Sequence, residues 1–179
     1  NLVYVQNATI GLNVVARSLD LKTGDEVLST NHEYGALDRT WRFLSKEKGF
    51  TYINQKVDLT SHDNFIKSFL EGITSNTKII FLSHITSPTA TIFPLEKIIQ
   101  FAKTKNIITI VDGAHAPGQI PLNLDLLGAD FYAGNLHKWL CAPKGAGFLY
   151  ARPEMQHLLK PLIVSWGYEA ETPNKSNRC

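Results

Sequence analysis

The stretch NIITIVDGAHAPG at residues 106–118 decides the fold class of this chain. Its first half, Asn106 to Val111, is a strand-sized apolar run that follows a helical pattern beginning at Pro94. Its second half opens with Asp112 and continues in small residues, which let a flat ligand approach the backbone. A helix that leads into an apolar strand with a polar loop behind it indicates one unit of a parallel α/β sheet.

The same alternation of strand-like and helix-like patterns runs along most of the chain, so we predict an α/β layer fold. The helix that starts at Asn7 is expected to place Ile10, Val14 and Leu21 on one side, with Gly24 near its end. The further strands are predicted at Glu26 to Thr30, Phe50 to Asn54, Lys78 to Ser83, Ala129 to Ala133 and Gly147 to Ala151. The other helices are predicted at Tyr34 to Lys48, after the N-cap Ser61, and near Leu122 to Leu127.

The composition excludes several classes of protein. Of the 179 residues, 44% are hydrophobic and 19% are charged, which suits an ordinary globular core and a soluble protein. No stretch approaches the ~20 consecutive apolar residues of a membrane-spanning helix. Lys and Arg number 18 against 16 Asp and Glu, so nothing points to nucleic acid or a membrane surface as a partner. Two cysteines and no secretory segment predict a reducing, cytoplasmic setting.

The chain is expected to hold one domain and the start of a connection. We predict one incomplete domain over residues 1–165, because no linker is evident before about Ser165. Residues 166–179 are expected to begin the connection to a missing C-terminal domain, since the tail after Glu171 is polar and ends without a closing element. The first residue is Asn1 rather than Met, so we expect a fragment of a longer protein.

Side chains with catalytic chemistry follow the predicted strands at the points where the strands end. In open parallel sheets, ligands bind beyond the carboxyl ends of the strands. A single histidine there is more often structural than catalytic, but a convergence of several such residues on one edge favours a functional site. The residues at these ends are His32, His84, Asp112, His115, Asn135, His137 and Lys138.

Lys138 and Asp112 carry the most specific chemistry of this set. An apolar, aromatic setting destabilises the charged form of Lys138 and favours the neutral amine that Schiff-base chemistry requires. A buried carboxylate at Asp112 needs a cationic partner, which could be Lys138 or a protonated ligand nitrogen. The structural alternatives are an aspartate that caps the following turn and a lysine that runs along Trp139 to solvent.

Five blocks of sequence resemble a known family in their order along the chain. The blocks are Asn7-Ala8-Thr9, Thr30-Asn-His-Glu-Tyr34, Ser83-His-Ile-Thr-Ser-Pro-Thr89, Val111 to Gly118, and His137-Lys138-Trp139 with Pro143-Lys144-Gly145. The chain resembles, over about Asn7 to Gly167, the class V group of fold-type-I enzymes that depend on pyridoxal 5'-phosphate (PLP). This group includes cysteine desulfurases, isopenicillin-N epimerase-like proteins and related lyases. The resemblance implies a three-layer α/β/α large domain with a mostly parallel sheet and a homodimer when the protein is complete.

The resemblance also implies roles for individual residues toward PLP and an amino-acid substrate. Lys138 would form the Schiff base with PLP and then move a proton at the substrate's α-carbon. Asp112 would keep the pyridine nitrogen protonated, which makes the ring a better electron sink. His32 would stack on the ring, and His115 would lie beside its phenolic oxygen. The phosphate would be held at the start of the first helix and just before the lysine, by Ala8, Thr9, Asn135 and His137.

The branch of the family stays open at this stage. Cysteine desulfurases generally carry Asn-Asn-Glu-x-Gly where this chain has Thr86-Ser-Pro-Thr-Ala90. This difference points away from desulfurases, and Asn31 to Tyr34 together with Ser165-Trp-Gly167 look more like the epimerase-like branch. Epimerisation, elimination, desulfuration and amino transfer all remain candidates. Cys141 lies too close to the lysine to be a mobile nucleophile, and we expect a partly buried thiol there.

Two other functions compete with a PLP enzyme. A metal-dependent hydrolase would use imidazole and carboxylate ligands for zinc or iron, although their spacing matches no recognised metal motif. Its candidate ligands are His84, Asp112, His115 and His137. A protein that keeps the fold only as a binding module is the third possibility, and the nearly complete set of cofactor residues argues against it.

Overall fold

The computed structural model describes residues 1–165 and 168, and in this part of the chain seven strands form one sheet in the order β1-β7-β6-β5-β4-β2-β3. The neighbours from β3 to β6 pair in parallel, whereas β7 pairs antiparallel with both β6 and β1. The strands are β1 (Leu2–Val5), β2 (Glu26–Thr30), β3 (Thr51–Gln55), β4 (Thr77–Ser83), β5 (Ile108–Gly113), β6 (Phe131–Asn135) and β7 (Gly147–Ala151). Each predicted strand is present, but β5 and β6 begin and end two residues later than predicted, so Asp112 and Asn135 lie inside strands rather than after them. β1 was not predicted.

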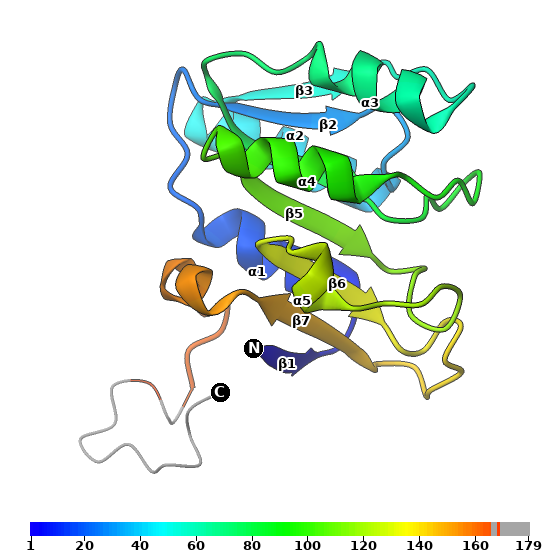
Figure 1. The fold of residues 1–179 in the computed structure, drawn as a ribbon. Coiled ribbons are helices and arrows are strands. Elements are labelled where there is room, and N and C mark those ends of the chain that lie inside the picture. The colour runs from blue at the N-terminus through cyan, green and yellow to red at the C-terminus, as the bar shows by residue number, and fades with distance from the viewer. Residues whose placement is uncertain (166–167, 169–179) are drawn as a thin grey trace.

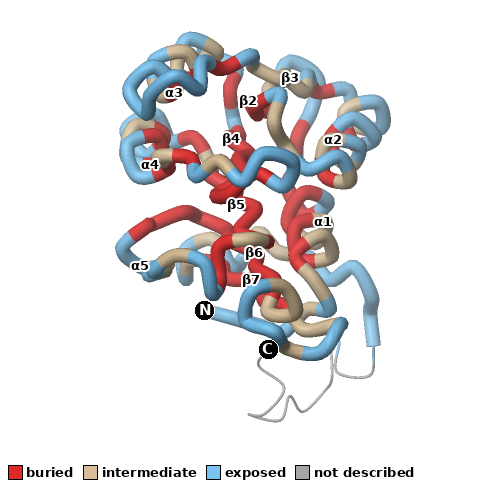
Figure 2. The backbone as a smooth tube through the Cα atoms, turned by 90° about the vertical axis from the view of Figure 1, so that its right-hand side faces the viewer, coloured by how far each residue is buried: buried red, intermediate tan, exposed pale blue. Residues whose placement is uncertain are grey.

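Helices cover both faces of the sheet, so the molecule has three layers (Figures 1 and 2). One face carries α1 (Ala8–Ser18) and α2 (Gly35–Lys48), and the other carries α3 (His62–Leu70), α4 (Leu95–Thr104) and α5 (Leu124–Leu127). A 3-10 helix, η1 (Pro153–Leu158), follows β7. Ser61 is the N-cap of α3, as predicted, because its side chain accepts the N–H of Asn64. None of the helices in the described residues is long and apolar enough to cross a membrane.

The central strands are buried on both faces, and consecutive residues enter different cores. In β4, Ile79 and Phe81 pack under α1 and α2, whereas Ile80 and Leu82 pack under α3 and α4. Trp41 of α2 is the largest fully buried side chain on its face. Continuous apolar strands of this kind are typical of parallel sheets covered by helices on each side.

The first helix differs from its prediction. It ends at Ser18, so Leu21 and Gly24 lie beyond it. Its buried face runs through Leu12 and Val15, while Ile10 and Val14 are half-buried. The reason is the close approach at Gly11, where a Cβ would lie 3.2 Å from the Cβ of Ala133 on β6. Small residues let this side of the helix settle on the sheet, and packing overrides the apolar pattern.

The loops that carry the candidate site residues all lie at one edge of the sheet. β2, β4, β5 and β6 are parallel, so their carboxyl ends meet there, and the arrowheads of β2, β5 and β6 point the same way in Figure 1. The expected connection over residues 166–179 and the Trp166-Gly167 pair of the family resemblance lie outside the described residues, apart from Tyr168.

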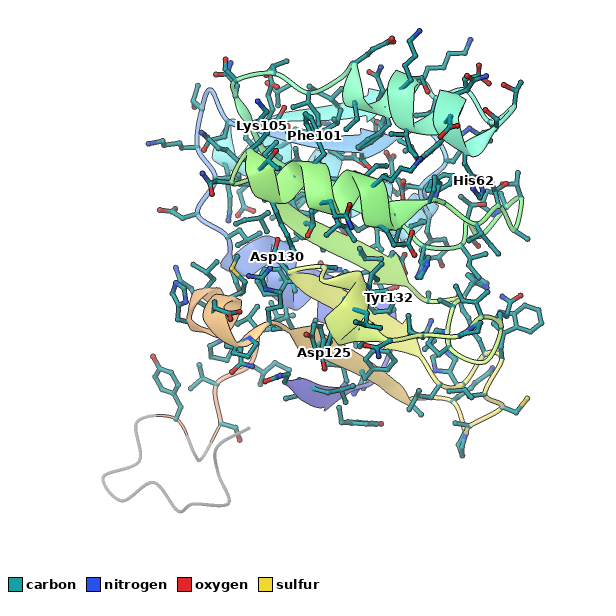
Figure 3. All side chains as sticks on the ribbon, in the orientation of Figure 1. His62, Phe101, Lys105, Asp125, Asp130 and Tyr132 are labelled. Carbon is teal, nitrogen blue, oxygen red and sulfur yellow. The ribbon has the colours of Figure 1, made fainter. Side chains whose placement is uncertain are left out.

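The contact between Gly113 and Tyr132 gives a test of this packing. A Cβ at Gly113 would overlap the ring of Tyr132, which is labelled in Figure 3 and fully buried on β6. We expect Gly113→Ala to lower the free energy of unfolding by ~1–3 kcal/mol, because the ring has to move within a close-packed core. Gly35→Ala, where only the end of Arg39 is near at 3.6 Å, should be neutral or stabilising. Urea denaturation of both variants checks this, and equal effects would contradict it.

Candidate active site

Asp112 is a buried carboxylate at the end of β5. Its side chain is 3% exposed, and its Oδ1 accepts the backbone N–H of Ala114 at 2.9 Å. Burial raises the pKa of Asp112 to about 6, and the N–H of Ala114 and the charge of Lys138 oppose this rise. Among the described residues, no hydrogen bond reaches its Oδ2 and no cation forms an ion pair with it. The site therefore holds a carboxylate whose charge lacks a direct partner.

Lys138 and His115 contact each other beside this carboxylate. The Lys138 Nζ lies 2.9 Å from the His115 Nε2, and the indole N–H of Trp139 donates to the His115 Nδ1 at 3.2 Å. Because an indole nitrogen only donates, the Nδ1 must be the acceptor, and a neutral His115 carries its proton on Nε2. That proton can be accepted only by an uncharged lysine amine. The geometry thus favours the neutral, nucleophilic form of Lys138.

The shifts in pKa agree with this assignment. Burial lowers the pKa of Lys138, and the negative charge of Asp112 opposes the change. Burial lowers the pKa of His115 as well, and the charge that a protonated Lys138 would carry acts in the same direction. Both side chains are only partly buried, so solvent still reaches the pair. An uncharged amine is the form that Schiff-base chemistry requires.

These groups line a small pocket at the carboxyl edge of the sheet. It is formed by the loops after β2, β4, β5 and β6, and its lining residues are Tyr34, Ser83, Ile85, Ser87, Asp112, Ala114, His115 and Lys138. Sequence reasoning missed the contributions of Tyr34 and Ser83. Both residues stand in sequence blocks that carry the family resemblance, Thr30 to Tyr34 and Ser83 to Thr89, and this was the available signal.

The loop after β2 contributes a second acid, the half-buried Glu33, to which sequence reasoning assigned no role. Its Oε1 accepts the hydroxyl of Thr30 at 2.6 Å, and its Oε2 accepts the backbone N–H and the hydroxyl of Ser83 at 2.8 and 2.6 Å. Burial, with a contribution from the charge of Asp112, raises the pKa of Glu33 to about 7 against the effect of these hydrogen bonds. The turn after β2 is thereby fastened to the end of β4.

The start of α1 lies against the end of β6. The Asn135 Oδ1 accepts the N–H of Ala8 at 2.8 Å, and Asn7 caps the helix by accepting the N–H of Ile10 at 2.9 Å. In the described part of the chain, neither the N–H nor the hydroxyl of Thr9 has a hydrogen-bond partner. Thr9 thus keeps free hydrogen-bond donors at the positive end of the helix dipole. The side-chain oxygen of Asn135, in contrast, is already bound to the helix N-terminus.

His137 and His32 occupy different surroundings. The His137 Nδ1 donates to the carbonyl of Ala146 at 2.9 Å, which leaves Nε2 as its second polar atom. His32 is half-buried in the turn after β2, and its backbone N–H donates to the hydroxyl of Thr30 at 3.1 Å. Its ring is not among the groups that line the pocket. The pocket wall contributed by that turn is Tyr34.

His84 does not join the site. Its Nδ1 lies 3.0 Å from the hydroxyl of Tyr132, on the face of the sheet covered by α4, and burial lowers its pKa. Successive residues of a strand point to opposite faces, so Ser83 faces the pocket and His84 the other core. The proposed metal ligands therefore do not converge: the described residues contain no group of three His, Cys, Asp or Glu that could hold a metal ion.

The expectation for Cys141 is wrong in one respect. Its side chain is exposed rather than partly buried, in a turn where the residue has a φ of 55°. The thiol lies 3.8 Å from the carbonyl of Trp139. Cys141 is thus a solvent-facing residue of the loop that follows the lysine.

The sequence of this chain matches a known protein family. The model of the aminotransferase class-V family matches residues 1–175. The chain is 34% identical to isopenicillin N epimerase from Amycolatopsis lactamdurans, over 98% of this chain and 46% of the relative. It is 32% identical to a probable cysteine desulfurase from Vibrio cholerae, over 90% of this chain and 40% of the relative. The chain thus spans less than half the length of these curated relatives.

Solved structures share the fold as well. The cystine C-S lyase C-DES, in complex with its reaction product cysteine persulfide, superposes with a TM-score of 0.86 at 28% identity, over 93% of this chain and 45% of the lyase. A mutant of the same lyase carries glycine covalently linked to its PLP cofactor and gives a TM-score of 0.86 at 26% identity, over 93% of this chain and 44% of the mutant. The predicted fold class, a mostly parallel three-layer domain of this kind, is confirmed. A family model that covers almost the whole chain, together with this shared fold, makes the chain a member of the aminotransferase class-V family.

Proposed function

We propose that this chain forms the cofactor-binding part of a PLP-dependent enzyme that acts on an amino acid or an amino-acid derivative. Lys138 is the amine that would hold the cofactor's aldehyde carbon as a Schiff base. The observation that carries the proposal is the contact of Lys138 with His115, which favours an uncharged amine beside the buried carboxylate of Asp112. The relatives in this family are named as an epimerase, lyases and desulfurases, which supports the same class of chemistry.

The donor set of the site fits PLP. The buried Asp112 lacks a cation at its Oδ2 among the described residues, and burial alone raises its pKa. A protonated pyridine nitrogen would supply both a positive charge and a donor there, and would let the carboxyl group ionise. Ala114, which lines the pocket next to Asp112, has a small side chain that leaves room for a flat ring. The phosphate would find free donors at Thr9.

The residues of this chain divide the work at the site. PLP, when bound, supplies the electron sink that lowers the barrier at the substrate's α-carbon. Asp112 would hold a proton on the ring nitrogen. The Lys138 amine would move a proton at the substrate's α-carbon, and the His115–Trp139 contact orients this amine.

The remaining predicted contacts to the cofactor complete the proposal. Thr9 would bind the phosphate through its N–H and hydroxyl, and Ala8 and Asn135 would hold the start of α1 in place for it. His137 would reach the phosphate through its Nε2, since its Nδ1 is bound to Ala146. His32 would stack on the ring after a change in its side-chain position, because its ring does not line the pocket.

We further infer a cytoplasmic homodimer in which residues 1–165 form the large domain and residues 166–179 lead to a further domain. Contiguous apolar patches on a soluble protein often indicate an interface, and exposed apolar side chains on β1 and on the loop after Lys138, which the Tyr4 hydroxyl contacts at Gly145, support an assembly. They include Tyr4 on β1 and Trp139 and Leu140 after the active lysine, which are 71%, 54% and 53% exposed.

Reductive labelling tests the role of Lys138. The full-length protein would be incubated with PLP, reduced with borohydride and digested for peptide mass spectrometry. We expect the phosphopyridoxyl mass on the peptide that contains Lys138, and no such label in Lys138→Ala. The matched control is Lys144→Ala, an exposed lysine in the same loop, which should leave the label in place. An unmodified Lys138 in folded protein would contradict the proposal.

Asp112→Asn separates cofactor binding from catalysis. The amide cannot keep a proton on the ring nitrogen, so we expect kcat to fall by about 100-fold, which corresponds to ~3 kcal/mol for a hydrogen bond to a charged group. The borohydride label on Lys138 should remain. The reaction followed is turnover of the amino-acid substrate found by screening, and an unchanged kcat would contradict the assigned role of Asp112.

The pKa of Asp112 predicts a pH dependence of stability in the cofactor-free protein. Burial raises this pKa from 3.8 to about 6, so the stabilisation from the protonated carboxyl is complete below about pH 4 and is lost as the pH rises through 6. The Asp112→Asn variant has no titrating group at this position. We therefore expect its free energy of unfolding to rise by up to ~3 kcal/mol relative to that of the parent as the pH goes from 4 to 7. Urea denaturation across this range measures the difference, and a constant difference would argue against a buried titrating group.

A further inference from the structure

Glu33 makes an unusual set of contacts for an acid next to a binding site. Both of its oxygens face donors: the hydroxyl of Thr30 on one side, and the N–H and hydroxyl of Ser83 on the other, all at 2.6 to 2.8 Å. Thr30 closes the turn as well, because its hydroxyl accepts the N–H of His32. One carboxylate thus joins the end of β2, the turn 31–34 and the end of β4.

Holding a turn in this way requires the partial desolvation of a carboxyl group that has no cation nearby in the described part of the chain. Glu33 forms no ion pair within the described residues, and the titratable groups that face it are Asp112 from β5 and Tyr52 from β3. Neither of them is a cation, and burial raises the pKa of Glu33 to about 7. Glu33 is half-buried, and a carboxyl group that is partly removed from water without a cationic partner is rarely favourable for stability alone. Its position beside the pocket suggests a role in the site.

The contacts of Glu33 with Thr30 and Ser83, which we call the Glu33 clamp, lie directly next to residues that line the pocket. Ser83, which donates twice to Glu33, lines the pocket and pairs in register with Asp112 across β4 and β5. Tyr34, the residue after Glu33, lines the same pocket. A shift of the turn would therefore move one wall of the pocket relative to Asp112 and Lys138.

We propose that Glu33 is a positioning residue of this site: its carboxylate fastens the turn that carries His32 and Tyr34 to the end of β4, and so sets the pocket wall that meets the cofactor ring. This inference rests on the proposed PLP function. Every partner of the Glu33 carboxylate is a donor, so the ionised form accepts all of these hydrogen bonds. An amide in its place keeps these contacts only if its NH₂ group donates to the Thr30 hydroxyl, which must then turn its own proton away, and its neutral oxygen accepts from Ser83 more weakly than a carboxylate does.

Glu33→Gln in the full-length protein tests the clamp first without cofactor. We expect hydrogen exchange of the Ser83 amide to speed up by at least about tenfold, because its acceptor is weakened. Glu26→Gln is the matched control. The Glu26 carboxylate likewise accepts two threonine hydroxyls, those of Thr74 and Thr77, but lies at the other end of β2. Glu26→Gln should leave exchange at Ser83 unchanged.

The second measurement asks whether the clamp positions the cofactor. We expect Glu33→Gln to weaken PLP binding by about tenfold and to change the visible circular dichroism of bound PLP, which reports the orientation of the ring. Glu26→Gln should match the parent in both. Parent-like PLP affinity and dichroism in Glu33→Gln would overturn the proposal and leave Glu33 a purely structural residue.

Two other outcomes are a Glu33→Gln variant that does not fold and a parent protein that binds no PLP. If Glu33→Gln does not fold, Thr30→Val decides, since it removes the hydroxyl donor with little change of shape. We expect about threefold weaker PLP binding and a dichroism change of the same sign, and parent-like values would overturn the proposal. A parent protein that takes up no PLP would contradict the proposed function and this inference together, and is recognised before any variant is made.

Discussion

The parallel pairing of β4 with β5 is the constraint on which the site depends. Its register places Ser83 beside Asp112, so that both side chains leave the sheet on the face covered by α1 and α2. Ser83 then meets Glu33 of the neighbouring turn, and Asp112 becomes a buried part of the pocket wall. A shift by one residue would send these side chains into the opposite core, because the side-chain period of a strand is two. The chemistry of the edge thus follows from strand register.

Burial acts in opposite directions on the acids and the bases of the site. It raises the pKa of Asp112 to about 6 and that of Glu33 to about 7, while it lowers the pKa of Lys138 and His115. The pKa values of the acids thus move up and those of the bases move down. A positively charged ligand beside Asp112 would oppose the rise in the pKa of that carboxyl group.

One face of the sheet carries the site residues, and the other supports them through packing. Tyr132 and His84 belong to the core under α4 and contact each other there, close to the site but on the other side of the strands. Gly113 lies directly over the Tyr132 ring, which ties the end of β5 to the packing of that core. The position of Asp112 accordingly depends on apolar packing on the face that carries no site residue.

Much of the architecture was predictable from local pattern. The strands from β2 to β7, the helices between them and the placement of polar residues at one edge follow from periodicity and from the parallel order that helical connections impose. β1 was not predicted, since a strand of four residues has little periodicity and is defined by its pairing with β7. The buried face of α1 was mispredicted because Gly11 allows a close approach that hydrophobicity does not report.

The sequence by itself determined the resemblance to the family and indicated Lys138, Asp112 and His115 as candidate site residues. Residue type and spacing along the chain carry that information. Tertiary structure alone decided which of the strand-end residues meet. It sent His84 to the opposite core, brought Glu33 onto Ser83 across a separation of 50 residues, and set the His115 tautomer through Trp139. The physical reason is that side-chain direction and hydrogen-bond partners depend on register and packing, which join residues distant in sequence.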